Sequence, residues 1–147
     1  DILQKTQFGR MKIEEELKRW KLDIRKGDTL LFYTAQYDRY YGKPEYMTDY
    51  PGLDREATEF IIDQGCSNFG VDAASPDMWY DKTYPCHSVC AERKVTHIEN
   101  LCNLDKVVGK RFTFIMLPLK IRKGTGSPIR AIALVSEGEE ITWQITS

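Results

Sequence analysis

What the sequence lacks limits the functions open to it. No apolar run approaches the roughly 20 residues that a membrane-spanning helix needs, so we expect no membrane association. The formal net charge is -1 and no basic run stands out, which removes the electrostatic basis for binding nucleic acid. No signal peptide is visible, and we expect a cytoplasmic protein.

Cysteine and histidine are also scarce, with four and two residues in the chain. Four cysteines are too few for a disulfide scaffold, and the apolar surroundings of Cys66 and Cys102 favour buried free thiols. With His87 and His97 as the two histidines, a metal site must also use carboxylates, cysteines or groups on another polypeptide.

The rest of the composition is that of an ordinary globular protein, with 41% hydrophobic and 29% charged residues. A chain of 147 residues is the size of one domain. No internal repeat, low-complexity segment or clear linker divides it. We therefore predict a single domain over residues 1–147.

Hydrophobic periodicity predicts two helices, over Met11–Leu22 and Leu53–Gly65, the second with Asp54 as its N-cap. The Tyr-rich stretch 35–52 matches neither period and predicts a long surface loop of the kind that often covers a site. Strands alternating with helices predict an α/β domain with a mixed central sheet and flanking helices. The strands are expected in segments 28–35, 68–77, 95–98, 111–119, 129–135 and 141–145.

His87 and Glu99 are the first candidates for chemistry. Imidazole and carboxylate together suit zinc, manganese or iron(II), and a spacing of twelve residues fits ligands on two neighbouring segments rather than one helical turn. On composition alone, a solvated histidine and a surface glutamate that caps the next turn explain the same residues.

Two cysteine-based alternatives use the same region. Cys86 and Cys90, with His87 and His97 nearby, have the donors of a closed structural zinc site, although adjacent side chains such as Cys86 and His87 usually diverge. A nucleophilic Cys90 paired with His87 is the second alternative, with Arg93 and Lys94 available to lower the pKa of the thiol. No orienting Asn or Asp is obvious for it.

Two turns carry polar groups that could support a site. GVDAASPD places Asp72, Ser75 and Asp77 in one tight turn after a strand, although a simple Asx-turn has the same pattern. GTGSPIR could present backbone N–H groups to an anion or carbonyl oxygen, with Arg130 as a fixed positive charge, or form a hairpin-like connection.

The order of these elements resembles the C-terminal part of the cyclase family of metal-dependent hydrolases. The resemblance rests on RKGDTLLFYTA, on PGLDREATEFIIDQG, on GVDAASPD, on the spacing from His87 to ENLCNL, and on GTGSPIRAIAL. It runs from about Ile24 to Leu134. In that family the histidine and glutamate at the positions of His87 and Glu99 are metal ligands, so the resemblance implies that role here.

The chain also departs from that family. A signature of the form His-x-Gly-Thr-His-x-Asp-x-Pro-x-His supplies most of the family's metal ligands and its catalytic histidine, and nothing here resembles it. We therefore expect those groups on an N-terminal segment or a partner chain, and we expect this chain alone not to be catalytically competent. His97 is isolated in the sequence, and we expect it to support the site rather than bind metal.

The resemblance implies the swivelling β/β/α-like cyclase fold, a divalent zinc or manganese ion, and a small-molecule substrate. The implied reaction is kynurenine formamidase-like or isatin hydrolase-like hydrolysis of an amide, formamide, cyclic amide or lactone by a metal-activated water. It also implies a homo-oligomer. The candidates for orienting the ligands are Asp72, Ser75 and Asn100. The candidates for substrate binding are Tyr37, Tyr40, Trp79 and Arg130.

The main alternative function is a non-catalytic binding module that uses its Tyr-rich surface on a partner. A further alternative is that the chain is a subunit of a split enzyme and needs a partner chain that carries the His-rich signature. These alternatives differ in whether a segment carrying the His-rich signature accompanies this chain.

Overall fold

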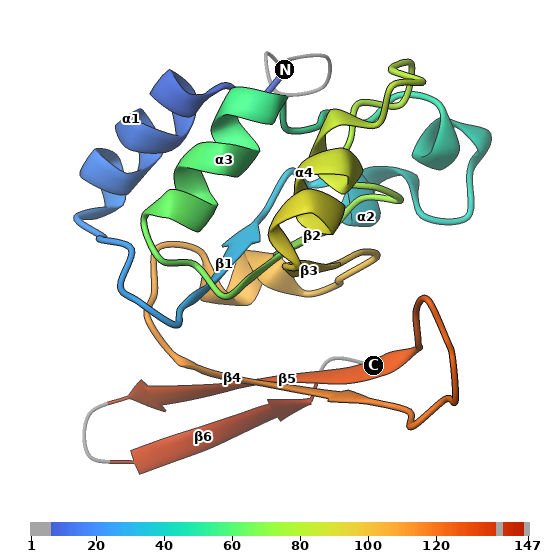
Figure 1. Ribbon diagram of the computed structural model, residues 1–147. Coiled ribbons are helices and arrows are strands. Elements are labelled where there is room, and N and C mark those ends of the chain that lie inside the picture. Colours follow the sequence, from blue (N-terminus) through green and yellow to red (C-terminus); the bar gives the residue numbers. More distant parts are fainter. Residues whose placement is uncertain (1–6, 138–139, 146–147) are drawn as a thin grey trace. The chain divides into compact units, whose positions relative to one another are not determined.

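A computed structural model describes residues 7–137 and 140–145, and its chain falls into two compact units, Asp1–Gly109 and Lys110–Ser147 (Figure 1). The helices and strands confirm the α/β class, with the strands in two three-stranded sheets, one parallel and one antiparallel. The elements of the first unit are α1 (Arg10–Trp20), β1 (Thr29–Phe32), α2 (Gln36–Tyr40), η2 (Pro44–Met47), α3 (Arg55–Asp63), β2 (Asn68–Val71), α4 (Pro85–Arg93), β3 (Thr96–Ile98) and η3 (Leu104–Val107). Those of the second are β4 (Thr113–Pro118), β5 (Ile129–Glu137) and β6 (Glu140–Ile145).

The sheet of the first unit is parallel, in the order β1-β2-β3. All four residues of β2 are buried, as expected for a central strand covered on both faces, while β1 at the edge is half-buried. Because the strands are parallel, their carboxyl ends meet at one edge of the sheet. That edge is where ligands bind in open α/β sheets.

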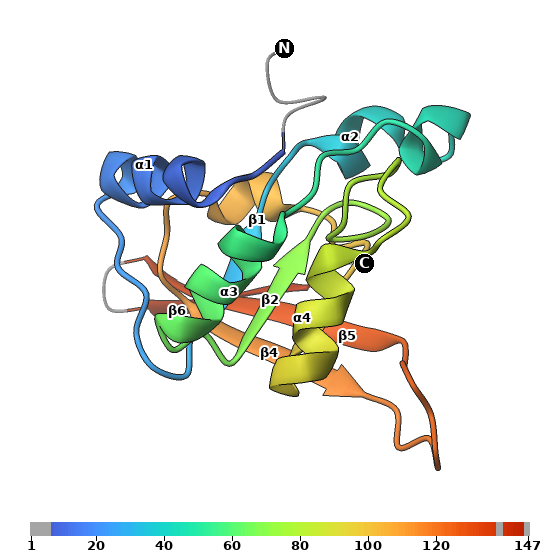
Figure 2. The same ribbon diagram turned by 45° about the horizontal axis from the view of Figure 1, so that its top comes forward.

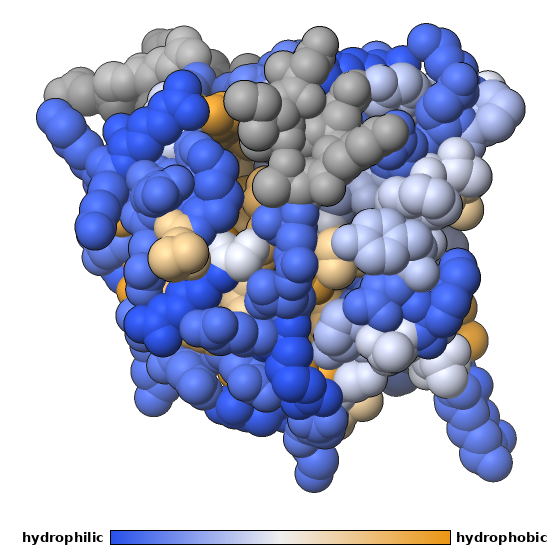
Figure 3. All heavy atoms as spheres, turned by 90° about the horizontal axis from the view of Figure 1, so that it is seen from above, coloured by the Kyte–Doolittle hydropathy of each residue, from blue (hydrophilic) through white to orange (hydrophobic). Residues whose placement is uncertain are grey.

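Three helices cover one face of this sheet, with α3 packed between α1 and α4 (Figures 1 and 2). Their apolar positions supply Ile13, Ala57, Ile61 and Cys86 to a core that also includes Phe69 of β2. The face seen in Figure 3 is mostly hydrophilic with scattered apolar residues. This pattern is typical of helices that bury one stripe and leave the rest in water.

Both predicted helices are confirmed, with slightly shorter bounds. The Asp54 carboxylate accepts a hydrogen bond of 2.7 Å from the backbone N–H of Ala57 and so caps α3 as predicted. In α1, Ile13 is buried, whereas Trp20 is 41% exposed.

Two predictions of local structure need correction. The stretch 35–52 is not one irregular surface loop, because it contains α2 and η2 and buries Tyr46. The Gln36 side chain donates to the carbonyl of Glu45 at 3.1 Å and ties these two helices together. Helix α4 was not expected at all, since its sequence PCHSVCAER has little helical periodicity.

The second unit is an antiparallel sheet in the order β4-β5-β6. It confirms the three C-terminal strands predicted from the sequence. Leu117, Leu119 and Ile121 are each more than half exposed. None of the helices in the described part of the chain has the length and apolar character that a membrane crossing requires.

Candidate metal centre

The site begins at the carboxyl edge of the parallel sheet. Thr34, Asp72 and Glu99 each follow one of the strands β1, β2 and β3. Residues 97 and 99 are two apart in an extended segment, so the side chains of His97 and Glu99 point to the same side. The fold therefore gathers polar groups from three strand ends at this edge.

Helix α4 brings the second part of the site. Pro85 occupies its first turn, where the missing N–H costs nothing. The Asp77 carboxylate, only 1% exposed, accepts hydrogen bonds from the backbone N–H groups of Cys86 at 2.6 Å and His87 at 3.3 Å. A carboxylate at this end also suits the helix dipole, so Asp77 caps α4 from outside the helix.

The same carboxylate fixes the ring of His87. Asp77 Oδ2 lies 2.5 Å from Nδ1 of His87. With Nδ1 engaged by a buried carboxylate, the other ring nitrogen, Nε2, is left to face the site. Asp77 therefore sets the orientation of the imidazole.

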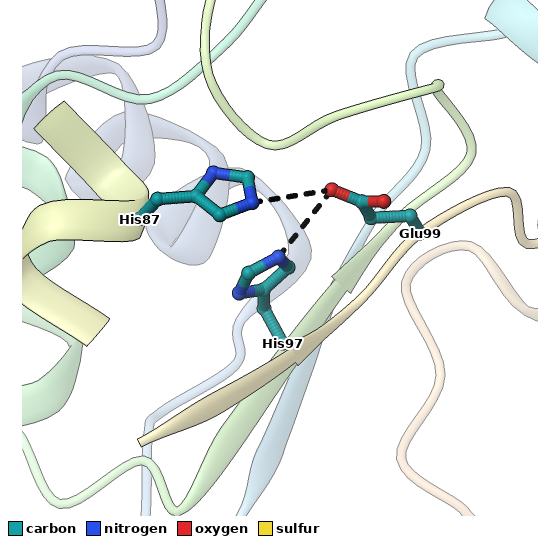
Figure 4. Close-up of side chains that lie close together, drawn as sticks. All are labelled: His87, His97 and Glu99. Atoms are coloured by element: carbon teal, nitrogen blue, oxygen red, sulfur yellow. Dashed lines mark ion pairs between the residues drawn. The ribbon is translucent and has the colours of Figure 1, made fainter. Parts of the chain in front are cut away.

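His87, His97 and Glu99 converge on one point, as Figure 4 shows. Oε1 of Glu99 lies 3.7 Å from Nε2 of His87 and 3.4 Å from Nε2 of His97. The two rings meet edge to face, with centroids 4.5 Å apart. His97 is the most enclosed of the three, with 16% of its side chain exposed against 31% for Glu99 and 43% for His87.

This geometry fits a divalent metal ion. Ligand atoms about 2.0–2.2 Å from a tetrahedral zinc lie roughly 3.3–3.6 Å from one another. The two nitrogen-to-oxygen distances are close to that value, and the three donor atoms all lie within 4.8 Å of each other. Nitrogen and oxygen donors suit zinc or manganese, so the donor set agrees with a divalent ion of either kind.

The surroundings of His97 hold its ring in place. It stacks on the buried ring of Phe69, with centroids 5.9 Å apart, and its side chain is hydrogen-bonded to the Cys90 thiol. Burial lowers the pKa of His97, but the hydrogen bonds to Cys90 and Glu99 outweigh it and raise that pKa to about 9. The proton so retained sits beside the Glu99 carboxylate, where a bound cation would replace it.

Cys86 and Cys90 face the core rather than forming a separate zinc site. Both are buried members of the hydrophobic core, and all four cysteines are free thiols. The hydrogen bond with Cys86 is the largest influence on Cys90 and, with that of His97, lowers the pKa of its thiol to about 5 against the effect of burial. The same bond raises the pKa of Cys86. Cys90 contacts His97, whereas the sequence had suggested His87 as its partner.

Of the three residues expected to orient the ligands, Asp72 and Asn100 lie just after β2 and β3, and Ser75 lies in the turn after β2. Oδ1 of Asp72 accepts hydrogen bonds from the backbone N–H and the hydroxyl of Thr34 at 2.9 and 2.6 Å. Ser75 accepts from the backbone N–H of Asp77 at 3.1 Å. Asn100, directly after Glu99, accepts from the Tyr46 hydroxyl at 2.7 Å and has φ of 58°.

The residues expected to bind substrate come from several elements of the chain. The ring of Tyr37 stacks on that of Tyr41, with centroids 4.4 Å apart. The Nζ atom of Lys43 lies over the ring of Tyr40, 5.9 Å from its centroid. Trp79 is 39% exposed and meets Tyr80 edge to face. Arg130 lies on β5 opposite Leu117, in the second unit.

Sequence reasoning missed two residues next to the imidazole of His87. Asp77 was named among the polar groups of the GVDAASPD turn that could support a site, but its contact with His87 was not predicted. Tyr84, 49% exposed, lies edge to face with His87 at 6.1 Å between ring centroids. A carboxylate that accepts from a backbone N–H nine residues later in the chain is no recognised capping pattern, so the sequence held little signal for either role.

The fold and the site together define an α/β protein with a candidate metal centre at its sheet edge. A profile of the family described as "Putative cyclase" matches residues 2–78, just over half of the chain. The chain belongs to this cyclase family. The matched range includes Asp72 and Asp77, whereas His87, His97 and Glu99 lie beyond it.

Individual relatives agree with this family. The chain is 32% identical over 117 residues to a protein named isatin hydrolase from Roseibium aggregatum, covering 77% of this chain and 41% of that one. It is 26% identical over 132 residues to a kynurenine formamidase from Bacillus anthracis, covering 90% and 58%. The chain thus spans about half the length of the curated relatives it matches.

Solved structures show the same fold. An isatin hydrolase bound to the product analogue thioisatinate superposes with a TM-score of 0.81 and 26% identity, over 90% of this chain and 54% of that one. A structure described as a novel cyclase gives a TM-score of 0.77 at 20% identity, over 88% and 47%. The second, at such low identity, shows the fold alone.

Proposed function

We propose that this chain forms part or all of a metal-dependent hydrolase that cleaves an amide, formamide or cyclic amide C–N bond, or a lactone, in a small molecule. The observation that carries the proposal is the convergence of His87 and Glu99 on one point at the carboxyl edge of the sheet. The names of the relatives, isatin hydrolase and kynurenine formamidase, support the reaction class.

The chain's residues would position the ion and keep it accessible. His87 and Glu99 would hold zinc or manganese, and Asp77 would keep Nδ1 of His87 engaged so that Nε2 binds. When bound, a divalent ion polarises a carbonyl and activates water for attack. With 43% of the His87 side chain exposed, a substrate can approach this side of the centre.

Aromatic side chains beside the centre would bind an aryl substrate by stacking. Tyr84 is the strongest candidate, because its exposed ring already contacts His87. We also propose that the four residues named from the sequence help to bind the substrate. In chain order they are Tyr37, Tyr40, Trp79 and Arg130. Aromatic rings offer large contact areas at a low cost in side-chain entropy.

We further propose that the remaining ligands and the proton-transferring histidine come from a His-rich segment, either N-terminal in the same polypeptide or on a partner chain. A homo-oligomer is the expected assembly. Support comes from the extent of the match, since the chain corresponds to 41–58% of the two relatives described above.

Removing either candidate ligand tests the function. In the complete enzyme, which also carries the His-rich segment, His87→Ala and Glu99→Ala should each lower bound zinc or manganese, measured by elemental mass spectrometry, and reduce hydrolysis of an aryl formamide, an aryl lactam or a lactone by at least about 100-fold. Circular dichroism should show both variants folded. Glu56→Ala, which removes an exposed carboxylate from the first turn of α3, should change neither quantity.

Two outcomes would contradict the proposal. Full activity in either variant would remove His87 or Glu99 from the ligand set. A wild-type protein that includes the segment preceding this chain or its partner chain, and that is folded, metal-free after incubation with zinc and manganese, and inactive on all three substrate types, would favour the non-catalytic binding module.

A further inference from the structure

His97 is an unusual residue for its position on β3. It lies on the half-buried face of the strand, stacked on the fully buried Phe69. An imidazole enclosed there is costly unless its polar atoms are satisfied. Two partners satisfy it: the Cys90 thiol and Oε1 of Glu99, 3.4 Å from Nε2.

The position of Nε2 is that of a ligand rather than of a supporting group. It lies closer to the shared Glu99 oxygen than Nε2 of His87 does, at 3.4 Å against 3.7 Å. Both distances match the edges of a tetrahedral site, which are roughly 3.3–3.6 Å. A residue that only braced Glu99 would not need to direct its nitrogen to the point where the His87 nitrogen also converges.

Each histidine has a second polar partner besides Glu99. Asp77 engages one nitrogen of His87, and Cys90 engages the His97 side chain. Histidines that bind metal almost always have the second nitrogen occupied by such a partner, which fixes tautomer and ring orientation. Helix α4 provides one ligand in His87 and, one turn later, the group that orients the other in Cys90.

We propose that His97 is a third metal ligand supplied by this chain, and that Cys90 is the positioning residue that orients its ring. This inference rests on the proposed metal-dependent function and adds a ligand to it. His87, His97 and Glu99 then form one face of the coordination sphere. The other positions are left for the ligands proposed on the His-rich segment and for water.

Cobalt(II) binding to the full chain provides the test, because its absorption reports the ligand set without requiring activity. His97→Gln should weaken cobalt(II) and zinc binding by about 100-fold or more and change the cobalt spectrum, since a ligand is lost. His97→Cys should restore binding and add a sulfur-to-cobalt charge-transfer band that the wild-type protein lacks. That band requires residue 97 to touch the ion.

Cys90→Ala tests the positioning role separately. It should weaken metal binding by about 10–100-fold while leaving the cobalt spectrum of the wild-type ligand set in place. Cys66→Ala is the matched control, because Cys66 is equally buried, at 4% against 5%, and precedes β2 at the opposite edge of the sheet from Glu99. Cys66→Ala should bind the ion as wild type does.

The outcomes separate this inference from the proposed function. If His97→Gln binds cobalt with wild-type affinity and spectrum, or if His97→Cys gives no new band, His97 is only an ion-pair partner of Glu99. The hydrolase proposal would then stand on His87 and Glu99. If Cys90→Ala matches Cys66→Ala, Cys90 has no positioning role. If the wild-type chain binds no ion, the proposed metal centre itself fails.

Discussion

Asp72 is a nearly fully buried carboxylate whose two oxygens have unequal surroundings. Oδ1 accepts two hydrogen bonds from Thr34, whereas Oδ2 has no hydrogen-bond partner within the described part of the chain. Burial raises the pKa of Asp72, against the effect of the Thr34 hydrogen bonds. Asp72 was predicted from the sequence to support the metal ligands, and its burial disfavours the ionised form of its carboxyl group.

We expect Asp72→Asn to reduce the pH dependence of stability. The pKa of Asp72 is higher in the folded protein than in the unfolded chain, so the folded state binds more protons. The free energy of unfolding therefore falls as pH rises above the ordinary aspartate pKa of about 4. Asparagine keeps an oxygen for Thr34 and removes the charge, so the variant should gain stability relative to wild type as pH rises.

Urea unfolding of the two proteins between about pH 4 and pH 8 measures this difference. Asp105→Asn, which changes an exposed aspartate of the same unit, is the control and should leave the slope unchanged. Parallel stability curves for wild type and Asp72→Asn would mean that Asp72 titrates as it does in the unfolded chain.

At the scale of secondary-structure elements, the turn that carries Asp77 is hydrogen-bonded to the segment before α3. The backbone N–H of Leu53 donates to the carbonyl of Pro76 at 2.8 Å, and Phe8 donates to the carbonyl of Gly52 at 2.8 Å. Gly52 allows this approach because a Cβ there would overlap backbone atoms of Asp77 and Met78. The position of the Asp77 carboxylate, and through it His87, depends on this contact.

Gly52→Ala should therefore destabilise the fold and weaken the metal centre together. Backbone atoms cannot move aside as a flexible side chain can, so we expect a loss of about 1–3 kcal/mol or more in unfolding free energy. Zinc binding, measured by competition with a chelator, should weaken because the added Cβ would displace the turn and, with it, the Asp77 carboxylate. Gly126→Ala is the control, since a Cβ there meets no atom within 4 Å, and it should cost less than about 0.5 kcal/mol. Unchanged zinc affinity in Gly52→Ala would separate the turn from the site.

At the scale of the whole molecule, the three residues of the metal centre all belong to the first unit. An ion that binds only the folded state stabilises it by about 2.7 kcal/mol at a hundredfold excess over the dissociation constant. If residues 1–147 behave as the single domain predicted from the sequence, this gain should extend to strands β4, β5 and β6.

Hydrogen exchange with and without zinc measures that coupling. We expect slowly exchanging amides of both units to gain equal protection, because one global unfolding step exposes them. Glu99→Gln should abolish the gain in both. A gain restricted to residues 7–109 would show two units that unfold separately, and no gain in either would argue against zinc binding.

Local sequence was sufficient for much of the fold. The periodicity of α1 and α3, the Asp54 cap and the turn-bounded strands depend on residues within a few positions of each other, so their interactions were visible in the chain itself. The same is true of the spacing from His87 to Glu99, which the family resemblance made recognisable. Helix α4 escaped prediction because its start is stabilised by Asp77, which lies outside the range of a local capping pattern.

The sequence by itself determined the α/β class, the family and two candidate ligands. Only the tertiary structure decided that the His97 side chain converges on the same point, that Asp77 orients His87 and that Cys90 contacts His97. These contacts arise where α4 packs against β3, and packing between elements is set by the shape of the whole core rather than by any one segment. Side-chain convergence of this kind has no periodicity or spacing that a sequence can display.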